Sequence, residues 1–128
     1  TPGLWQAIRT LEAAWSTGDR ESLRALAAYP EVLDRELDAL LDENGWSPPP
    51  QLATFSDQQR DPIRRMIFPD GELPVWRSEA LVAGQWLSFD WIQYEGRWRL
   101  LAIGDPRERL GQWEEGERAM SYFGSAPR

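Results

Sequence analysis

The sequence predicts an α+β domain in which N-terminal helices pack on one face of a curved antiparallel β-sheet. Apolar residues recur at spacings of three and four up to about residue 44, which is typical of amphipathic helices. From Leu73 to Gly104 apolar and polar residues instead tend to alternate, as they do in half-buried strands. The 128 residues fit one domain, 1–128, with no internal repeat or domain boundary.

The first part of the chain, about residues 4–44, is expected to form three helices. The first runs from Leu4 to Thr17, and Gly18 follows it as the residue that ends the helix. Asp19 is expected to cap the second helix, with Ser22 three residues later. Pro30 suits the first turn of a third helix that continues to about Asn44.

A proline-rich connector, about residues 45–55, separates these helices from the rest of the chain. Its three consecutive prolines exclude a helix and a central strand. Asp61 and Pro62 then indicate a short helix at about residues 61–67, and Pro69-Asp70-Gly71 indicates a turn. The charged, glycine-interrupted segment 105–128 is expected to be irregular.

The sheet, about residues 73–104, is expected to contain three strands joined by tight turns. The strands are Leu73–Ala83, Gln85–Tyr94 and Arg97–Gly104, and the turns lie at Gly84 and at Glu95-Gly96. A two-residue turn places Tyr94 opposite Arg97, from which the register follows by counting. The face predicted to be buried under the helices carries Leu87, Phe89, Trp91, Trp98, Leu100 and Ala102.

Asp90 falls on the opposite, mixed face of this predicted sheet. That face also carries Trp86, Ser88, Ile92, Tyr94, Arg97, Arg99, Leu101 and Ile103. Asp90 is either a hydrated or Arg-paired residue of a solvent face or subunit interface, or the single carboxylate of a half-enclosed pocket. Desolvation in such a pocket would raise its pKa and suit it to acid–base chemistry. The turn at Gly84 leaves open whether Arg77 or Glu79 lies beside it.

Composition excludes several classes of function. Cys and His are absent, which excludes disulfides, thiolate chemistry, imidazole bases and His-ligated metals, and no cofactor or metal is expected. Lys is absent too, so all cations are Arg. A net charge of −7 argues against nucleic-acid binding, and no segment is apolar enough to insert into a membrane. The eight Trp predict an aromatic-rich core, with Trp5, Trp15 and Trp98 inside it.

Two segments resemble the nuclear transport factor 2-like superfamily, which includes ketosteroid isomerase and the SnoaL-like cyclases. They are the helix pair "LEAAWSTGDRESLRAL" and the hairpin "YEGRWRLLAIGDP". The resemblance implies a cone-like α+β fold, often dimeric through the sheet face. The long third helix and the proline-rich connector depart from the family pattern. The missing His also removes a residue that the family's enzymes often use.

The leading functional hypothesis is a small, dimeric, non-catalytic module that binds a protein partner or an apolar small molecule. The ligand or pocket candidates are Trp76, Trp86, Asp90, Tyr94 and Arg99. One alternative is a pocket isomerase, dehydratase or cyclase in which Asp90 is catalytic and Tyr94 or Trp86 orients the substrate. In a binder, Asp90→Asn should leave affinity and stability nearly unchanged, whereas in an enzyme it should abolish turnover.

The remaining alternatives concern the cellular setting of the protein. They are an accessory protein of the cell envelope or of secretion, and an immunity-type inhibitor whose acidic surface covers a basic active site. The chain begins at Thr1 rather than at Met. We therefore expect a processed fragment, located in the cytoplasm or, after removal of an N-terminal signal, in the periplasm.

Overall fold

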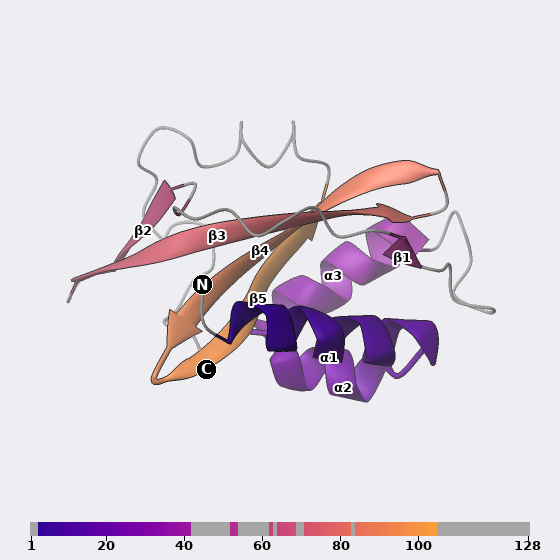
Figure 1. Ribbon diagram of the computed structural model, residues 1–128, viewed down its shortest axis with the longest axis horizontal. Coiled ribbons are helices and arrows are strands. Elements are labelled where there is room, and N and C mark those ends of the chain that lie inside the picture. Colours follow the sequence, from indigo (N-terminus) through magenta and orange to yellow (C-terminus); the bar gives the residue numbers. More distant parts are fainter. Residues whose placement is uncertain are drawn as a thin grey trace.

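In the part of the chain that the computed structural model describes, three helices precede the strands and gather on one side of an open antiparallel sheet (Figure 1). The described residues are 3–41, 52–53, 62, 64–68, 71–82 and 84–104. The α+β prediction with N-terminal helices is confirmed. The elements are α1 (Leu4–Ser16), α2 (Arg20–Leu26), α3 (Pro30–Leu41), β1 (Leu52–Ala53), β2 (Arg64–Phe68), β3 (Gly71–Val82), β4 (Gln85–Tyr94) and β5 (Arg97–Gly104).

Strand β3 organises the sheet because it pairs with three other strands. Its first half pairs with β2, its second half with β4, and its end with β1. Strand β4 also pairs with β5, and every one of these pairings is antiparallel. Glu95 and Gly96 have φ values of 53° and 74°. These positive values form the two-residue turn that places Tyr94 opposite Arg97, as predicted.

The prediction of a helix at about residues 61–67 is wrong for those residues of the segment that the structure describes. Arg64–Phe68 is a strand, with Phe68 opposite Gly71 and Arg64 opposite Val75. Residues 69 and 70 of the expected turn lie outside the described residues, and main-chain pairing of Arg64–Phe68 with β3 overrides the local signal for a helix start. Within the connector only Leu52–Ala53 is described, paired with β3, and the segment 105–128 lies outside the described residues.

Local chemistry fixes the junction between α1 and α2. Gly18 has φ 68°, and its N–H donates to the Trp15 carbonyl while the Asp19 N–H donates to the Ala14 carbonyl, a Schellman ending. Asp19 then caps α2, because its Oδ1 accepts a hydrogen bond of 3.1 Å from the Ser22 N–H. Hydrogen bonds from the Ser22 hydroxyl and then from its N–H hold the pKa of Asp19 below its ordinary value of 3.8.

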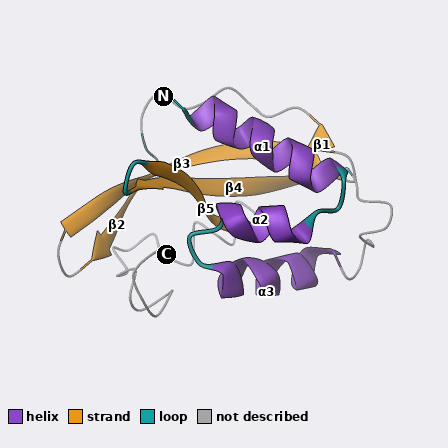
Figure 2. Ribbon diagram, turned by 90° about the horizontal axis from the view of Figure 1, so that it is seen from below, coloured by secondary structure: helices purple, strands orange, loops and turns teal. Residues whose placement is uncertain are grey.

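The helices lie side by side in the order α1, α2, α3 beneath the strands (Figure 2). Their apolar faces and one face of the sheet enclose the main core. The buried members are Leu4, Ala7, Ile8, Leu11, Ala14, Trp15, Leu23, Ala27, Leu33, Leu37, Ala80, Val82, Leu87, Phe89, Trp91, Leu100 and Ile103. Trp15 lies in this core as predicted, Trp98 packs against it, and Trp5 is exposed, contrary to expectation.

A β-bulge in β5 changes the predicted distribution of side chains. Trp91 pairs with Leu100 as predicted, but Asp90 pairs with Ala102, so Leu101 is the extra residue. Beyond the bulge the alternation shifts by one position. Ile103 therefore joins the helix-side core, and Ala102 joins Leu101 in a second cluster, which corrects the predicted places of both Ile103 and Ala102.

The outer edge of β5 is covered by the segment that joins α2 to α3 and by α3 itself. The Ala28 N–H donates to the Leu100 carbonyl at 2.8 Å, and Glu36 Oε1 accepts from the Ile103 N–H at 2.9 Å. Main-chain groups of this edge strand thus have partners within the chain. The second cluster forms here, from Ala28, Tyr29, Val32, Val75, Ile92, Leu101 and Ala102.

Candidate functional site

Asp90 forms a bidentate ion pair with Arg77. The two residues are directly opposite in the β3–β4 register, whereas Glu79 lies opposite Ser88, which resolves the alternative that the sequence left open. Arg77 Nε donates to Asp90 Oδ1 at 2.7 Å, and Arg77 Nη2 donates to Asp90 Oδ2 at 3.1 Å. Both carboxylate oxygens are therefore engaged by one planar guanidinium, the geometry in which this pairing is strongest.

The pair is buried inside the protein, with 5% of Arg77 and 0% of Asp90 exposed. A buried charge is tolerated when an opposite charge and hydrogen bonds compensate it, and each residue compensates the other here. Loss of one charge leaves the other uncompensated. For this environment we therefore expect Asp90→Asn to lower the stability of the fold rather than to leave it nearly unchanged.

Apolar and neutral polar groups surround the ion pair on this face of the sheet. Val75 and Ile92 flank it along their strands, and Ala102 lies opposite Asp90 on β5. Ser88 is also buried and donates to the Gly104 carbonyl at 3.0 Å. The middle of the mixed face is thus buried within one chain, so a dimer through the sheet face would have to use its periphery.

A second buried titratable group, Tyr29, lies in the cluster beside this face. Burial, and then the nearby Tyr94, raise the pKa of Tyr29 well above its ordinary value of 10.0. Its hydroxyl therefore remains protonated at neutral pH. Within the described residues, no group of three or more acidic side chains is arranged to hold a metal ion.

The two tryptophan candidates, Trp76 and Trp86, have different surroundings from Asp90. Trp76 is half-buried and packs against the helix-side core, edge-on to Trp98 at 5.1 Å between ring centroids. Its indole N–H is buried, and no described residue accepts a hydrogen bond from it. Trp86, by contrast, is 49% exposed at the start of β4. The five candidates therefore do not form one pocket.

Tyr94 and Arg99 do lie together, and they adjoin a hollow that the sequence did not predict. The Arg99 guanidinium lies over the Tyr94 ring, 5.4 Å from its centroid. Arg97 and Arg99 line a hollow of about 230 Å³ together with Arg24 of α2. We call this hollow the arginine pocket; its other lining residues are Ala25, Ala27 and Pro30.

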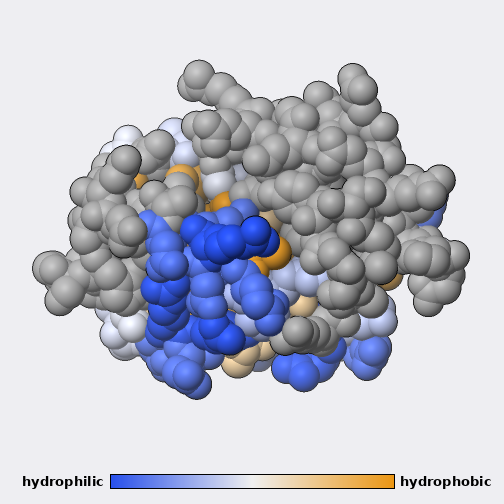
Figure 3. All heavy atoms as spheres, turned by 180° about the vertical axis from the view of Figure 1, so that it is seen from behind, coloured by the Kyte–Doolittle hydropathy of each residue, from blue (hydrophilic) through white to orange (hydrophobic). Residues whose placement is uncertain are grey.

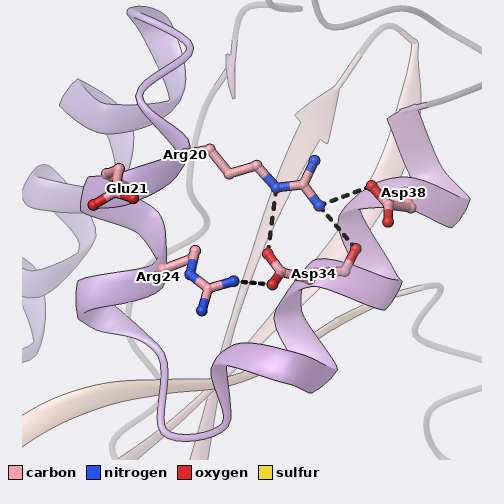
Figure 4. A pocket seen from close by; sticks show the side chains of 5 residues that line it. All are labelled: Arg20, Glu21, Arg24, Asp34 and Asp38. Atoms are coloured by element: carbon pink, nitrogen blue, oxygen red, sulfur yellow. Dashed lines mark hydrogen bonds and ion pairs between the residues drawn. The ribbon is translucent and has the colours of Figure 1, made fainter.

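A larger and more open hollow, of about 540 Å³, lies between α2 and α3 (Figure 4). Arg20 binds Asp34 at 3.3 Å and Asp38 at 2.8 Å, and Arg24 forms an ion pair with Asp34. These cations and carboxylates compensate one another, and exposed pairs of this kind stabilise a fold only weakly. The surface over the two helices is correspondingly hydrophilic (Figure 3).

Among the residues of the arginine pocket, Arg97 and Arg99 were predicted from sequence alternation alone to share one face of their strand. Arg24 was missed because its position depends on how α2 meets β5, and no local signal in the sequence carries that information.

Comparisons of the chain with protein-family models, with curated proteins and with solved structures gave no match. Among the described helices, none combines the length and the hydrophobicity that crossing a membrane requires.

Proposed function

We propose that this chain is a non-catalytic binding module that recognises a protein partner. The observation that carries this proposal is the buried Asp90–Arg77 pair. A general acid or base must reach its substrate and exchange a proton with it. Asp90 is fully buried, and both its oxygens accept hydrogen bonds from Arg77. This arrangement favours a structural role for the carboxylate over the catalytic alternative.

A protein partner fits the described surface better than an apolar small molecule does. Every described lining residue of the larger hollow is charged, and arginines make up half of those that line the arginine pocket. Within the described part of the chain, the large exposed apolar side chains are Trp5, at 40%, and Trp86, at 49%. Arg9 already lies over the Trp5 ring, at 4.9 Å from its centroid. Trp86 is the more available of the two, and exposed Trp residues are over-represented among side chains that dominate protein interfaces.

The test compares partner binding by matched variants of the whole chain. A photo-crosslinking residue placed next to Trp86 should capture a protein in stoichiometric amount from cells that produce the chain. We expect Trp86→Ala to reduce this capture about tenfold or more, the effect of losing a central interface Trp. Trp5→Ala, which removes the other exposed Trp, should reduce it less than about twofold.

The same preparation tests the enzyme alternative. We expect a metabolite extract incubated with the chain to remain unchanged over time, as it does with a heat-unfolded sample. The variant Arg77→Met/Asp90→Leu removes both buried charges and should retain partner capture. Conversion of a metabolite that persists in Trp86→Ala, and that disappears in a folded Arg77→Met/Asp90→Leu variant, would overturn the proposal.

A further inference from the structure

The arginine pocket concentrates positive charge in a chain whose net charge is −7. Three arginines line it, Arg24, Arg97 and Arg99, and no acidic side chain is among its described lining residues. Arginine remains positively charged at all physiological pH values. Like charges gathered in one hollow repel one another, so an anion placed between them would be favoured electrostatically.

The fold brings these arginines together from opposite ends of the sequence. Alternation along β5 places Arg97 and Arg99 on the same side of the strand, opposite Tyr94 and Ile92 of β4. The end of α2 meets β5 through a parallel bridge between Ala27 and Leu100. The hydrogen bond from the Ala28 N–H to the Leu100 carbonyl fixes that contact at 2.8 Å. Arg24 is thereby held beside the strand.

The three cations differ in how far the protein compensates them. Arg24 is paired with Asp34. Neither Arg97 nor Arg99 forms an ion pair with any residue that the structure describes. Arg99 Nε is buried and has no hydrogen-bond partner among the residues that the structure describes. A buried donor without an acceptor costs free energy, and an oxyanion in the pocket would supply the acceptor.

Two helix ends make smaller contributions, of opposite sign, to the electrostatic potential in the arginine pocket. The N-terminus of α3, a helix of 12 residues, lies at the pocket through Pro30, and a helix N-terminus favours an anion. The C-terminal end of α2, with 7 residues, is also close and disfavours one. Each end is equivalent to about half an elementary charge. The two effects largely cancel, and the charges of Arg97 and Arg99, which no described residue pairs, decide the sign of the potential in the pocket.

We propose that the arginine pocket binds an oxyanion of the size of a phosphate group. The hollow of about 230 Å³ exceeds the ~30 Å³ share of one water molecule several-fold, so it has room for such a group. Guanidinium groups match oxyanions through paired, charge-assisted hydrogen bonds. The anion is either free phosphate or a phosphorylated side chain of the protein partner. The site itself does not depend on the function proposed above.

Titration of the whole chain with inorganic phosphate, followed by NMR, tests the site. We expect saturable shifts of the Arg99 side-chain N–H and of the neighbouring backbone amides. Arg99→Gln and Arg97→Gln should each weaken binding about tenfold, the loss of one charge-assisted contact. Arg35→Gln removes the same charge from the exposed side of α3 and should weaken binding less than about twofold.

Two further measurements complete the test. A short peptide with one phosphoserine should bind more tightly than inorganic phosphate if the partner carries the anion, and no more tightly if the anion is free. The same peptide without the phosphate group should not bind. Absence of saturable phosphate binding, or equal weakening by Arg35→Gln and Arg97→Gln, would overturn the site. Partner capture that depends on Trp86 would be unaffected by that result, so the two proposals fail separately.

Discussion

The buried ion pair of Arg77 and Asp90 gives the sharpest prediction about stability. Asp90→Asn keeps the shape of the side chain but removes its charge. The Asn carbonyl can still accept from Arg77 Nε, but its NH₂ group faces the Nη2 donor that now contacts Oδ2 at 3.1 Å. The Arg77 charge then remains 95% buried without compensation, since 5% of that residue is exposed.

The size of the effect follows from this burial. Two opposite unit charges about 4 Å apart attract by about 4 kcal/mol at an effective dielectric constant of about 20. Measured losses on removing one partner of a buried pair are similar, about 3–5 kcal/mol. We therefore expect Asp90→Asn and Arg77→Met each to lower the free energy of unfolding by about 3 kcal/mol or more. This is a large fraction of the roughly 5–15 kcal/mol available to a domain.

Replacement of both residues should behave differently. Arg77→Met/Asp90→Leu fills the space with apolar groups and leaves no buried charge, so its free energy of unfolding should stay within about 2 kcal/mol of the wild type. Urea unfolding of the wild type, the two single variants and the double variant forms a complete cycle. Ser88→Ala, which removes a neutral hydrogen bond on the same face, should cost only about 1 kcal/mol.

Additive losses of stability in this cycle would show that the two charges do not compensate each other, contrary to the prediction. A loss below about 1 kcal/mol for Asp90→Asn would refute it as well, since a hydrated carboxylate is expected to behave in that way. Circular dichroism of each variant in the absence of urea provides the control for the folded state.

Three other residues give predictions of smaller scope. Ser78→Ala should lower the free energy of unfolding by about 1–3 kcal/mol, because Ser78 Oγ accepts the buried Trp91 indole N–H at 3.0 Å; equal urea midpoints would contradict this. Glu36→Ala should accelerate hydrogen exchange of the Ile103 amide, and an unchanged rate would show that the carboxylate does not protect it. The lowered pKa of Asp19 stabilises the fold fully above its ordinary value of 3.8, and this contribution is lost as pH falls through the lowered pKa. Thermal unfolding of Asp19→Asn should therefore depend less on pH in that acid range than unfolding of the wild type does.

Sequence alone predicted the elements whose signals are local. The Gly18–Asp19 junction, the turn at Glu95-Gly96 and the apolar stripes of the helices each depend on residues close together in the chain. They appear in the structure where they were expected. The separation of the helix-side face from the face of Asp90 followed from alternation along β4 and, up to the bulge, along β5.

The features that sequence did not predict depend on contacts between distant segments. The bulge falls within "LLAIG", where every side chain before the Gly is apolar, so alternation cannot show which residue is the extra one. The strand β2 exists because β3 pairs with it. The register at Gly84 brings Arg77 rather than Glu79 to Asp90, and the docking of α2 on β5 brings Arg24 to the other arginines.

We expect Asp90 to hold the fold together, while binding depends on surface groups. The most direct test is one phosphate titration of two folded variants, Arg77→Met/Asp90→Leu and Arg97→Gln/Arg99→Gln. We expect the first to bind phosphate within about twofold of the wild type and the second to lose binding by about tenfold or more. Loss of binding in the first variant, with retention in the second, would contradict the account.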